Sequence, residues 1–149
     1  MRYGAPVPLT DDQKAAWLAG VPLFSGISAE SMSRLAAVAG EQEFASGAFI
    51  VRQGQVGTGL YVIITGSVNV IRGSDDVLAT LNSGDFFGEL SVIDQQPRNA
   101  SVQAVEATSV LAVASWDLLN LLEHDPALSL NMIRGLVARV RAAGEQHRH

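Results

Sequence analysis

The sequence has 149 residues, and it contains no cysteine and few charged residues, only 17%. Without thiols the chain has neither a disulfide framework nor a thiolate metal site. Its formal net charge is −5, with 10 lysines and arginines against 15 aspartates and glutamates. A negative chain is not drawn to nucleic acid by its overall charge. We therefore expect no nucleic-acid partner.

Long apolar runs are missing as well. No segment holds enough consecutive apolar residues to span a bilayer, and residues 1–13 lack the apolar core of a signal peptide. We therefore expect no membrane contact and a cytoplasmic location. Apolar residues still make up 48% of the chain, which is enough for the core of one domain.

The sequence shows no catalytic signature. The histidines are His124, His147 and His149, and none of them lies among carboxylates in the central part of the chain. This argues against a metal-dependent jelly-roll enzyme. No Cys–His or Ser–His pairing at nucleophile spacing and no Walker-type loop is visible. We expect a binding protein rather than an enzyme, with no metal and no cofactor other than its ligand.

The two ends of the chain carry helical signals. Residues 1–20 are predicted to form an irregular arm and a helix that begins at Thr10, which has capping-box spacing to Gln13. Ser28 is the expected cap of a second helix, over 29–39. The main domain is expected to span residues 21–143.

The C-terminal part predicts two further helices. Ser115 is the expected cap of a helix over 116–123. Asp125 is the expected cap of a last helix, which runs from Pro126 to about Ala143 with apolar residues at spacings of three and four. Gly144 is expected to end that helix, and residues 144–149 to form a polar tail.

Between the helices the apolar period changes to two, which indicates strands. The strands are predicted over 49–51, 60–65, 67–71, 77–81, 102–105 and 109–114. The second and third are expected to form a hairpin around Thr65-Gly66. Short strands separated by glycine turns are typical of a β-sandwich or jelly roll. The expected fold is α+β, a β jelly roll flanked by N-terminal helices and two C-terminal helices.

One stretch, Gly84–Val102 (GDFFGELSVIDQQPRNASV), brings together residue types suited to a sugar phosphate. Gly88 has no Cβ, so the backbone can approach a ligand closely. Glu89 offers acceptor oxygens to a ribose hydroxyl. Arg98 presents a fork of donors that fits a phosphate, and the backbone amides that follow it can complete an anion site.

This stretch resembles the phosphate-binding cassette of cyclic nucleotide-binding domains. That family includes the regulatory subunits of cyclic AMP-dependent protein kinase, cyclic nucleotide-gated channels and the bacterial catabolite activator protein. The resemblance rests on FGELS at Phe87–Ser91 and PRNASV at Pro97–Val102. Upstream, residues 54–70 resemble the family's other recurring stretch, with Tyr61 and Gly66 at its aromatic and glycine positions. The resemblance covers most of the chain.

The resemblance implies a regulatory receptor domain for a 3′,5′-cyclic nucleotide, with the phosphate on Arg98 and the ribose 2′-hydroxyl on Glu89. Cyclic AMP is expected over cyclic GMP. In the family a small residue after the arginine accompanies cyclic AMP and threonine often accompanies cyclic GMP, and Asn99 is neither. An asparagine that caps its own loop is the alternative. The expected nucleotide-binding residues are Gly88, Glu89, Leu90, Arg98, Asn99, Ala100 and Ser101.

Several residues of this stretch are expected to have a structural part, alone or beside ligand binding. The hydroxyl of Ser101 contacts either the phosphate or a neighbouring strand. Leu90 and Ala100 are expected to shape the pocket by packing and backbone contact. Phe86 and Phe87 are expected in the core rather than stacked on a base.

The last helix also has two interpretations. Its apolar stripe either packs on the rest of the domain, or covers the base and pairs with a second copy to form a homodimer. Met132, Ile133 and Leu136 are the candidates for a base cap. Signalling is expected through movement of the C-terminal helices, on an effector protein or output domain outside this chain. The alternative is the same fold used as a protein-interaction module without nucleotide binding.

Overall fold

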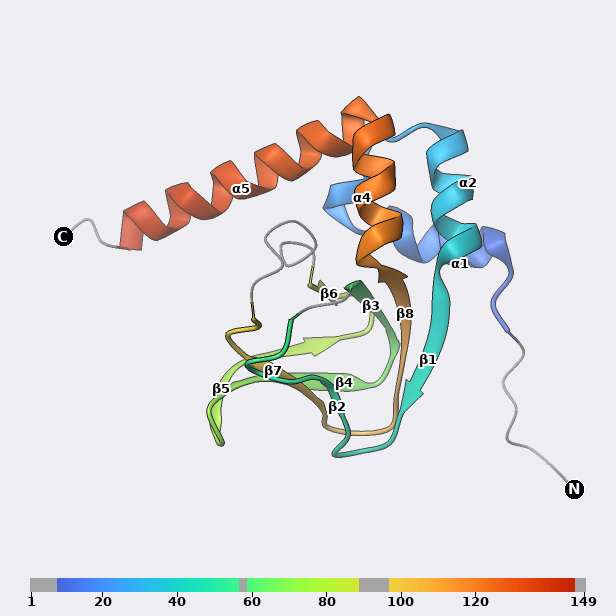
Figure 1. Cartoon of the computed structure of the whole chain (residues 1–149). Coiled ribbons are helices and arrows are strands. Elements are labelled where there is room, and N and C mark those ends of the chain that lie inside the picture. The colour runs from blue at the N-terminus through green and yellow to red at the C-terminus, as the bar shows by residue number, and fades with distance from the viewer. Residues whose placement is uncertain (1–7, 57–58, 89–96, 147–149) are drawn as a thin grey trace, which may run out of the picture.

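The computed structural model describes residues 8–56, 59–88 and 97–146. Two four-stranded antiparallel sheets form a jelly roll, and the helices gather at one end of it (Figure 1). N-terminal helices precede the roll and two C-terminal helices follow it. The expected α+β jelly roll is therefore confirmed.

The N-terminal helices are α1 (Asp11–Ala19), the 3-10 helix η1 (Pro22–Phe24) and α2 (Ala29–Val38). The capping box of α1 is formed as expected. Thr10 Oγ1 accepts from the Gln13 N–H at 3.1 Å, and Gln13 Oε1 accepts from the Thr10 N–H at 2.9 Å. Ser28 caps α2 by accepting from the Ser31 N–H. These bonds satisfy backbone donors that a helix start would otherwise leave without partners.

The strands run in the order β1-β8-β3-β6 in one sheet and β2-β7-β4-β5 in the other. The paired strands in both sheets are antiparallel. Their bounds are β1 (Gly40–Phe44), β2 (Phe49–Val51), β3 (Gly59–Thr65), β4 (Ser67–Arg72), β5 (Asp76–Asn82), β6 (Phe86–Phe87), β7 (Ser101–Ala104) and β8 (Thr108–Ala114).

The predicted hairpin around Thr65-Gly66 is wrong. β3 pairs with β6 and β8, whereas β4 pairs with β5 and β7. The turn therefore carries the chain from one sheet to the other. Gly66 has a φ of +92°, and a Cβ there would lie 2.5 Å from the carbonyl oxygen of Ala107. Only glycine fits such a close crossing with a positive φ.

Two hydrophobic clusters hold the molecule together. One joins the helices to β3 and β8 and includes Leu18, Leu35 and Leu118. The other lies inside the roll, where the Tyr61 and Phe87 rings stack with centroids 5.0 Å apart. Phe86 packs against the first cluster and Phe87 belongs to the second, so both phenylalanines are core residues as expected.

The C-terminal helices are α4 (Ser115–His124) and α5 (Pro126–Gln146). We expected Ser115 to cap α4, and this prediction is wrong. Ser115 is the buried first residue of that helix, and Ala114 occupies the N-cap position. The expected end of α5 is also wrong, because the helix continues through Gly144. A glycine ends a helix by adopting a positive φ, and Gly144 is not among the glycines with a positive φ.

The apolar stripe of α5 is buried only near its start. Leu128 and Met132 are 0% and 3% exposed, whereas Ile133 and Val140 are 56% and 71% exposed. The later turns of α5 extend away from the other helices (Figure 1). Among the described residues, no helix is long and apolar enough to cross a membrane.

Candidate functional site

The backbone of Arg98 is anchored from both sides just before β7. Its N–H donates to the Gln55 carbonyl and its own carbonyl accepts from the Gly54 N–H, both at 2.8 Å. Next to it, Pro97 forms an isolated β-bridge with Val56. This short antiparallel contact fixes the position from which the side chain of Arg98 extends.

The guanidinium group of Arg98 lies in a cradle of two glycines. Its Nη2 donates to the carbonyl of Gly59, the first residue of β3, at 3.1 Å. A Cβ on Gly88 would lie 3.3 Å from both Nη1 and Nη2, and would collide with the Gly59 carbonyl oxygen. The missing side chain of Gly88 therefore lets the guanidinium group pack directly against backbone. Because Gly59 pairs with Ala114, the cradle sits at the end of the roll where α4 begins.

Ser101 is buried and begins β7. Its Oγ accepts from the Gln53 N–H at 2.8 Å, and the side chain of Gln53 accepts from the Gly73 N–H at 2.7 Å. The hydroxyl of Ser101 thus binds the backbone that follows β2, which is the structural alternative we considered. Its contact with a phosphate stays a prediction.

The remaining predicted residues differ in how far the structure places them. Ala100 is half-buried beside Arg98, and Asn99 is exposed, with no hydrogen bond from its amide side chain to any described residue. Glu89 and Leu90 lie outside the described residues, so the ribose contact and the apolar contact expected of them stay predictions.

The structure thus brings Gly88 against the guanidinium group of Arg98, and Ala100 and Ser101 follow Arg98 along the chain into β7. A guanidinium group held in place beside the backbone amides of a turn is suited to binding an anion. Sequence reasoning missed the part played by Gly59, because a backbone carbonyl leaves no side-chain signal. Within the described ranges, no three His, Cys, Asp or Glu side chains come together as potential metal ligands.

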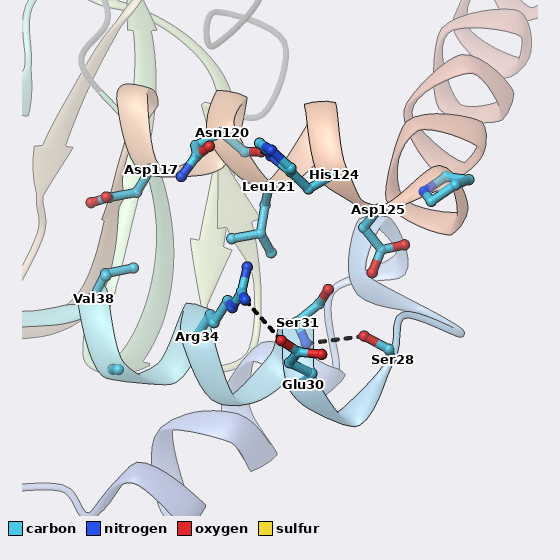
Figure 2. A pocket seen from close by; sticks show the side chains of 12 residues that line it. Ser28, Glu30, Ser31, Arg34, Val38, Asp117, Asn120, Leu121, His124 and Asp125 are labelled. Atoms are coloured by element: carbon cyan, nitrogen blue, oxygen red, sulfur yellow. Dashed lines mark hydrogen bonds and ion pairs between the residues drawn. The ribbon is translucent and has the colours of Figure 1, made fainter.

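A separate cavity of about 780 Å³ lies between α2 and α4 (Figure 2). Asp125 lies at one end of it and caps α5 as expected, with Oδ1 accepting from the N–H groups of Ala127 and Leu128 at 3.0 and 3.2 Å. A hydrogen bond from Ser31, together with those amides, lowers the pKa of Asp125 below its usual value, although burial opposes this. The lowered pKa favours the charged form of the carboxylate that caps α5.

Comparison with known proteins identifies close relatives. The family model described as "Cyclic nucleotide-binding domain" matches residues 41–125. The chain is 34% identical over 128 residues to the "Cyclic AMP receptor protein" of Thermus thermophilus, a match that covers 83% of this chain and 59% of the relative. It is 29% identical over 129 residues to the "cAMP-dependent protein kinase regulatory subunit" of Schizosaccharomyces pombe, covering 87% of this chain and 31% of the relative.

The fold is also similar to a solved structure. The catabolite activator protein of Thermus thermophilus superposes with a TM-score of 0.74 at 33% identity. The match covers 85% of this chain and 61% of that structure. The chain therefore spans less than two thirds of the length of each of these relatives.

Proposed function

The chain belongs to the cyclic nucleotide-binding domain family, and on this premise we propose that it is a regulatory receptor domain for a 3′,5′-cyclic nucleotide, with cyclic AMP favoured over cyclic GMP. The observation that carries the proposal is the glycine cradle, in which the Gly59 carbonyl holds the Arg98 guanidinium group. A donor that is already oriented loses less rotamer freedom when the ligand binds, and this favours affinity.

In this proposal the cyclic phosphate binds to Arg98 and to the backbone amides of Asn99 and Ala100. Glu89 accepts a hydrogen bond from the ribose 2′-hydroxyl, and Leu90 and Ser101 complete the pocket. A hydrogen bond to a charged group contributes about 1.5–3 kcal/mol of net free energy. The chain acts by binding, and its output comes from an effector protein or a further domain.

The names of the relatives support cyclic AMP as the preferred nucleotide. Both named relatives carry cyclic AMP in their descriptions. In this chain Asn99 occupies the position after Arg98, where the family often has threonine for cyclic GMP. The exposed amide of Asn99 is available to either base as donor and acceptor, so the preference is settled by measuring the two nucleotides side by side.

Signalling in this proposal uses the C-terminal helices. The start of α5 is tied to the N-terminal helices, because Asn131 Nδ2 donates to the carbonyls of Leu23 and Ser25. The later turns of α5 expose apolar side chains, among them Ile133, Val137 and Val140. A nucleotide that binds one position of these turns more tightly shifts the population toward that position.

The exposed stripe on α5 also supports a homodimer through this helix. Its members recur at spacings of three and four, which is the pattern of two packed helices. An apolar stripe of this kind marks an interaction site. The stripe consists of Leu130, Ile133, Val137 and Val140, all 45% exposed or more.

Thermal unfolding with and without nucleotide tests the proposal. A ligand at about a hundred times its dissociation constant adds about 2.7 kcal/mol of stability, and each kcal/mol raises the Tm of a chain of this size by roughly 2–4 °C. We expect a shift with cyclic AMP, a smaller one with cyclic GMP and with 2′-deoxy cyclic AMP, and little with 5′-AMP. No shift with either cyclic nucleotide would contradict the proposal.

A further inference from the structure

The cavity between α2 and α4, here called the α2–α4 groove, is built from facing turns of the two helices (Figure 2). Its lining residues recur every three or four positions along each helix, so they form two continuous walls. The groove ends at the joint where α4 ends and α5 begins. The residues that matter for its chemistry are Glu30, Arg34 and Val38 from α2, Asp117 and Leu121 from α4, and Asp125 at the joint.

The α2–α4 groove is negatively charged. Three carboxylates line it, against one guanidinium group and the imidazole of His124. That guanidinium, on Arg34, is already paired with Glu30, with Nη2 and Oε1 2.7 Å apart. Asp117 has no ion-pair partner among the residues that the structure describes. The groove therefore has negative charge left over to attract a cationic partner.

The α2–α4 groove also offers apolar surface between its charges. Leu121 forms a buried part of the lining, and Val38 is 44% exposed at the end of α2. Two helical walls with an apolar floor and charged rims are suited to a third helix, as in other helix-in-groove complexes. A volume of about 780 Å³ accommodates several side chains.

We propose that the α2–α4 groove is the docking site for a basic helical segment of a partner protein. Lysine or arginine side chains of that segment pair with Asp117 and share the Glu30 carboxylate with Arg34, and small apolar side chains pack on Leu121 and Val38. This surface is distinct from the glycine cradle around Arg98, so the proposal does not depend on nucleotide binding.

The width of the α2–α4 groove depends on the position of α4 relative to α2. One wall belongs to α2 and the other to α4, and Asp125 caps α5 at the end of the groove. A displacement of α4 relative to α2 changes the width of the groove. A partner docked there therefore senses the arrangement of the C-terminal helices.

A peptide titration tests the proposal on the whole chain. The probe is a short, fluorescently labelled amphipathic helical peptide of Lys, Leu and Ala, and its counterpart carries Glu in place of Lys. Fluorescence anisotropy should show binding of the Lys peptide and not of the Glu peptide. Glu30→Gln with Asp117→Asn should weaken binding about two- to thirtyfold, since each exposed ion pair contributes about 0.2–1 kcal/mol.

Matched variants separate docking in the groove from general charge attraction. Glu43→Gln with Asp75→Asn removes the same charge from exposed positions elsewhere on the roll and should leave peptide affinity unchanged. Ala37→Trp fills the groove from an exposed helix position without changing charge, and should also weaken binding. Equal loss in the control pair, no effect of Ala37→Trp, or no binding of the Lys peptide to the wild-type chain would each overturn the proposal.

Discussion

Gly88 lies so close to Arg98 that a Cβ on the glycine would stand 3.3 Å from both terminal guanidinium nitrogens. The two residues are ten positions apart in sequence and meet at the end of β6, where the Gly59 carbonyl accepts from Arg98. The absent side chain at Gly88 therefore belongs to the anion site as much as the arginine does.

The first prediction concerns Gly88→Ala. The new methyl group should displace the guanidinium group and lower cyclic AMP affinity at least about tenfold, measured by calorimetric titration, because part of a charge-assisted bond is lost. Gly88 has a φ of +96°, so the alanine variant also carries a backbone strain of about 1–3 kcal/mol. Gly84→Ala is the control, because Gly84 has a φ of +88° with no atom near its Cβ position. Similar affinity loss in both variants would point to strain rather than crowding.

The second prediction concerns Arg98→Ala and Arg98→Lys. Removal of the guanidinium group should weaken cyclic AMP binding by about 1.5–3 kcal/mol, or roughly ten- to hundredfold. Lysine should restore only part of this, since it keeps the charge but not the planar fork. Far-UV circular dichroism should show the fold intact. Arg52→Ala, which removes an exposed arginine packed on the Phe49 ring 4.2 Å away, serves as the control. Wild-type affinity in Arg98→Ala would exclude this residue from the site.

The third prediction concerns the pH dependence of stability through Asp125. Its pKa is lowered in the folded state, chiefly by Ser31, so the unfolded chain binds more protons in the acidic range. The stabilisation that ionised Asp125 provides is present above its ordinary pKa of 3.8. It is lost as the pH falls through the lower pKa that Asp125 has in the folded state. Urea unfolding between neutral pH and about pH 3 should therefore show a shallower acid loss in Asp125→Asn than in the wild type. Parallel pH profiles would contradict this assignment.

Asp125→Ala provides the matching stability measurement. It removes the cap of α5 as well as the charge, and should cost about 0.5–2 kcal/mol at neutral pH. Asparagine caps helices nearly as well as aspartate, so Asp125→Asn should lose less. The difference between the two variants separates the contribution of the cap from that of the charge.

The fourth prediction concerns the homodimer through α5. Val137→Glu places a charge in the exposed apolar stripe and should raise the dimer dissociation constant at least about tenfold, because a charge buried between helices is costly. Analytical ultracentrifugation measures this directly. Ala138→Glu introduces the same charge about 100° further round the helix and should leave the dimer intact. A wild-type chain that sediments as a monomer at all concentrations would remove the homodimer from the proposal.

Features that depend on neighbours in sequence were predictable. Thr10, Ser28 and Asp125 cap their helices as the sequence predicts, because each cap hydrogen bond reaches a residue two or three positions away. The sequence signal for a helix cap was misleading at the start of α4, where burial sets the boundary of the helix. Ser115 has the chemistry of a cap, yet α4 starts at this residue and buries it.

The candidate site was only partly predictable. The motif identified Gly88 and Arg98 by residue type and spacing, and the structure brings them together. The Gly59 carbonyl that holds Arg98 lies 39 positions earlier in the chain and leaves no trace in a side-chain pattern. The α2–α4 groove likewise depends on how two helices that are remote in sequence pack together.

The class of fold, three of the helix caps and the anion-binding residue types could be predicted from the sequence, because they depend on periodicity, short-range hydrogen bonds and side-chain chemistry. Which strands pair depends on the tertiary fold. The turn at Gly66 is typical of a hairpin, yet it joins two sheets, because β3 pairs with β8 while β4 pairs with β5 and β7. Strand pairing minimises the free energy of the whole roll, and no single turn contains that information.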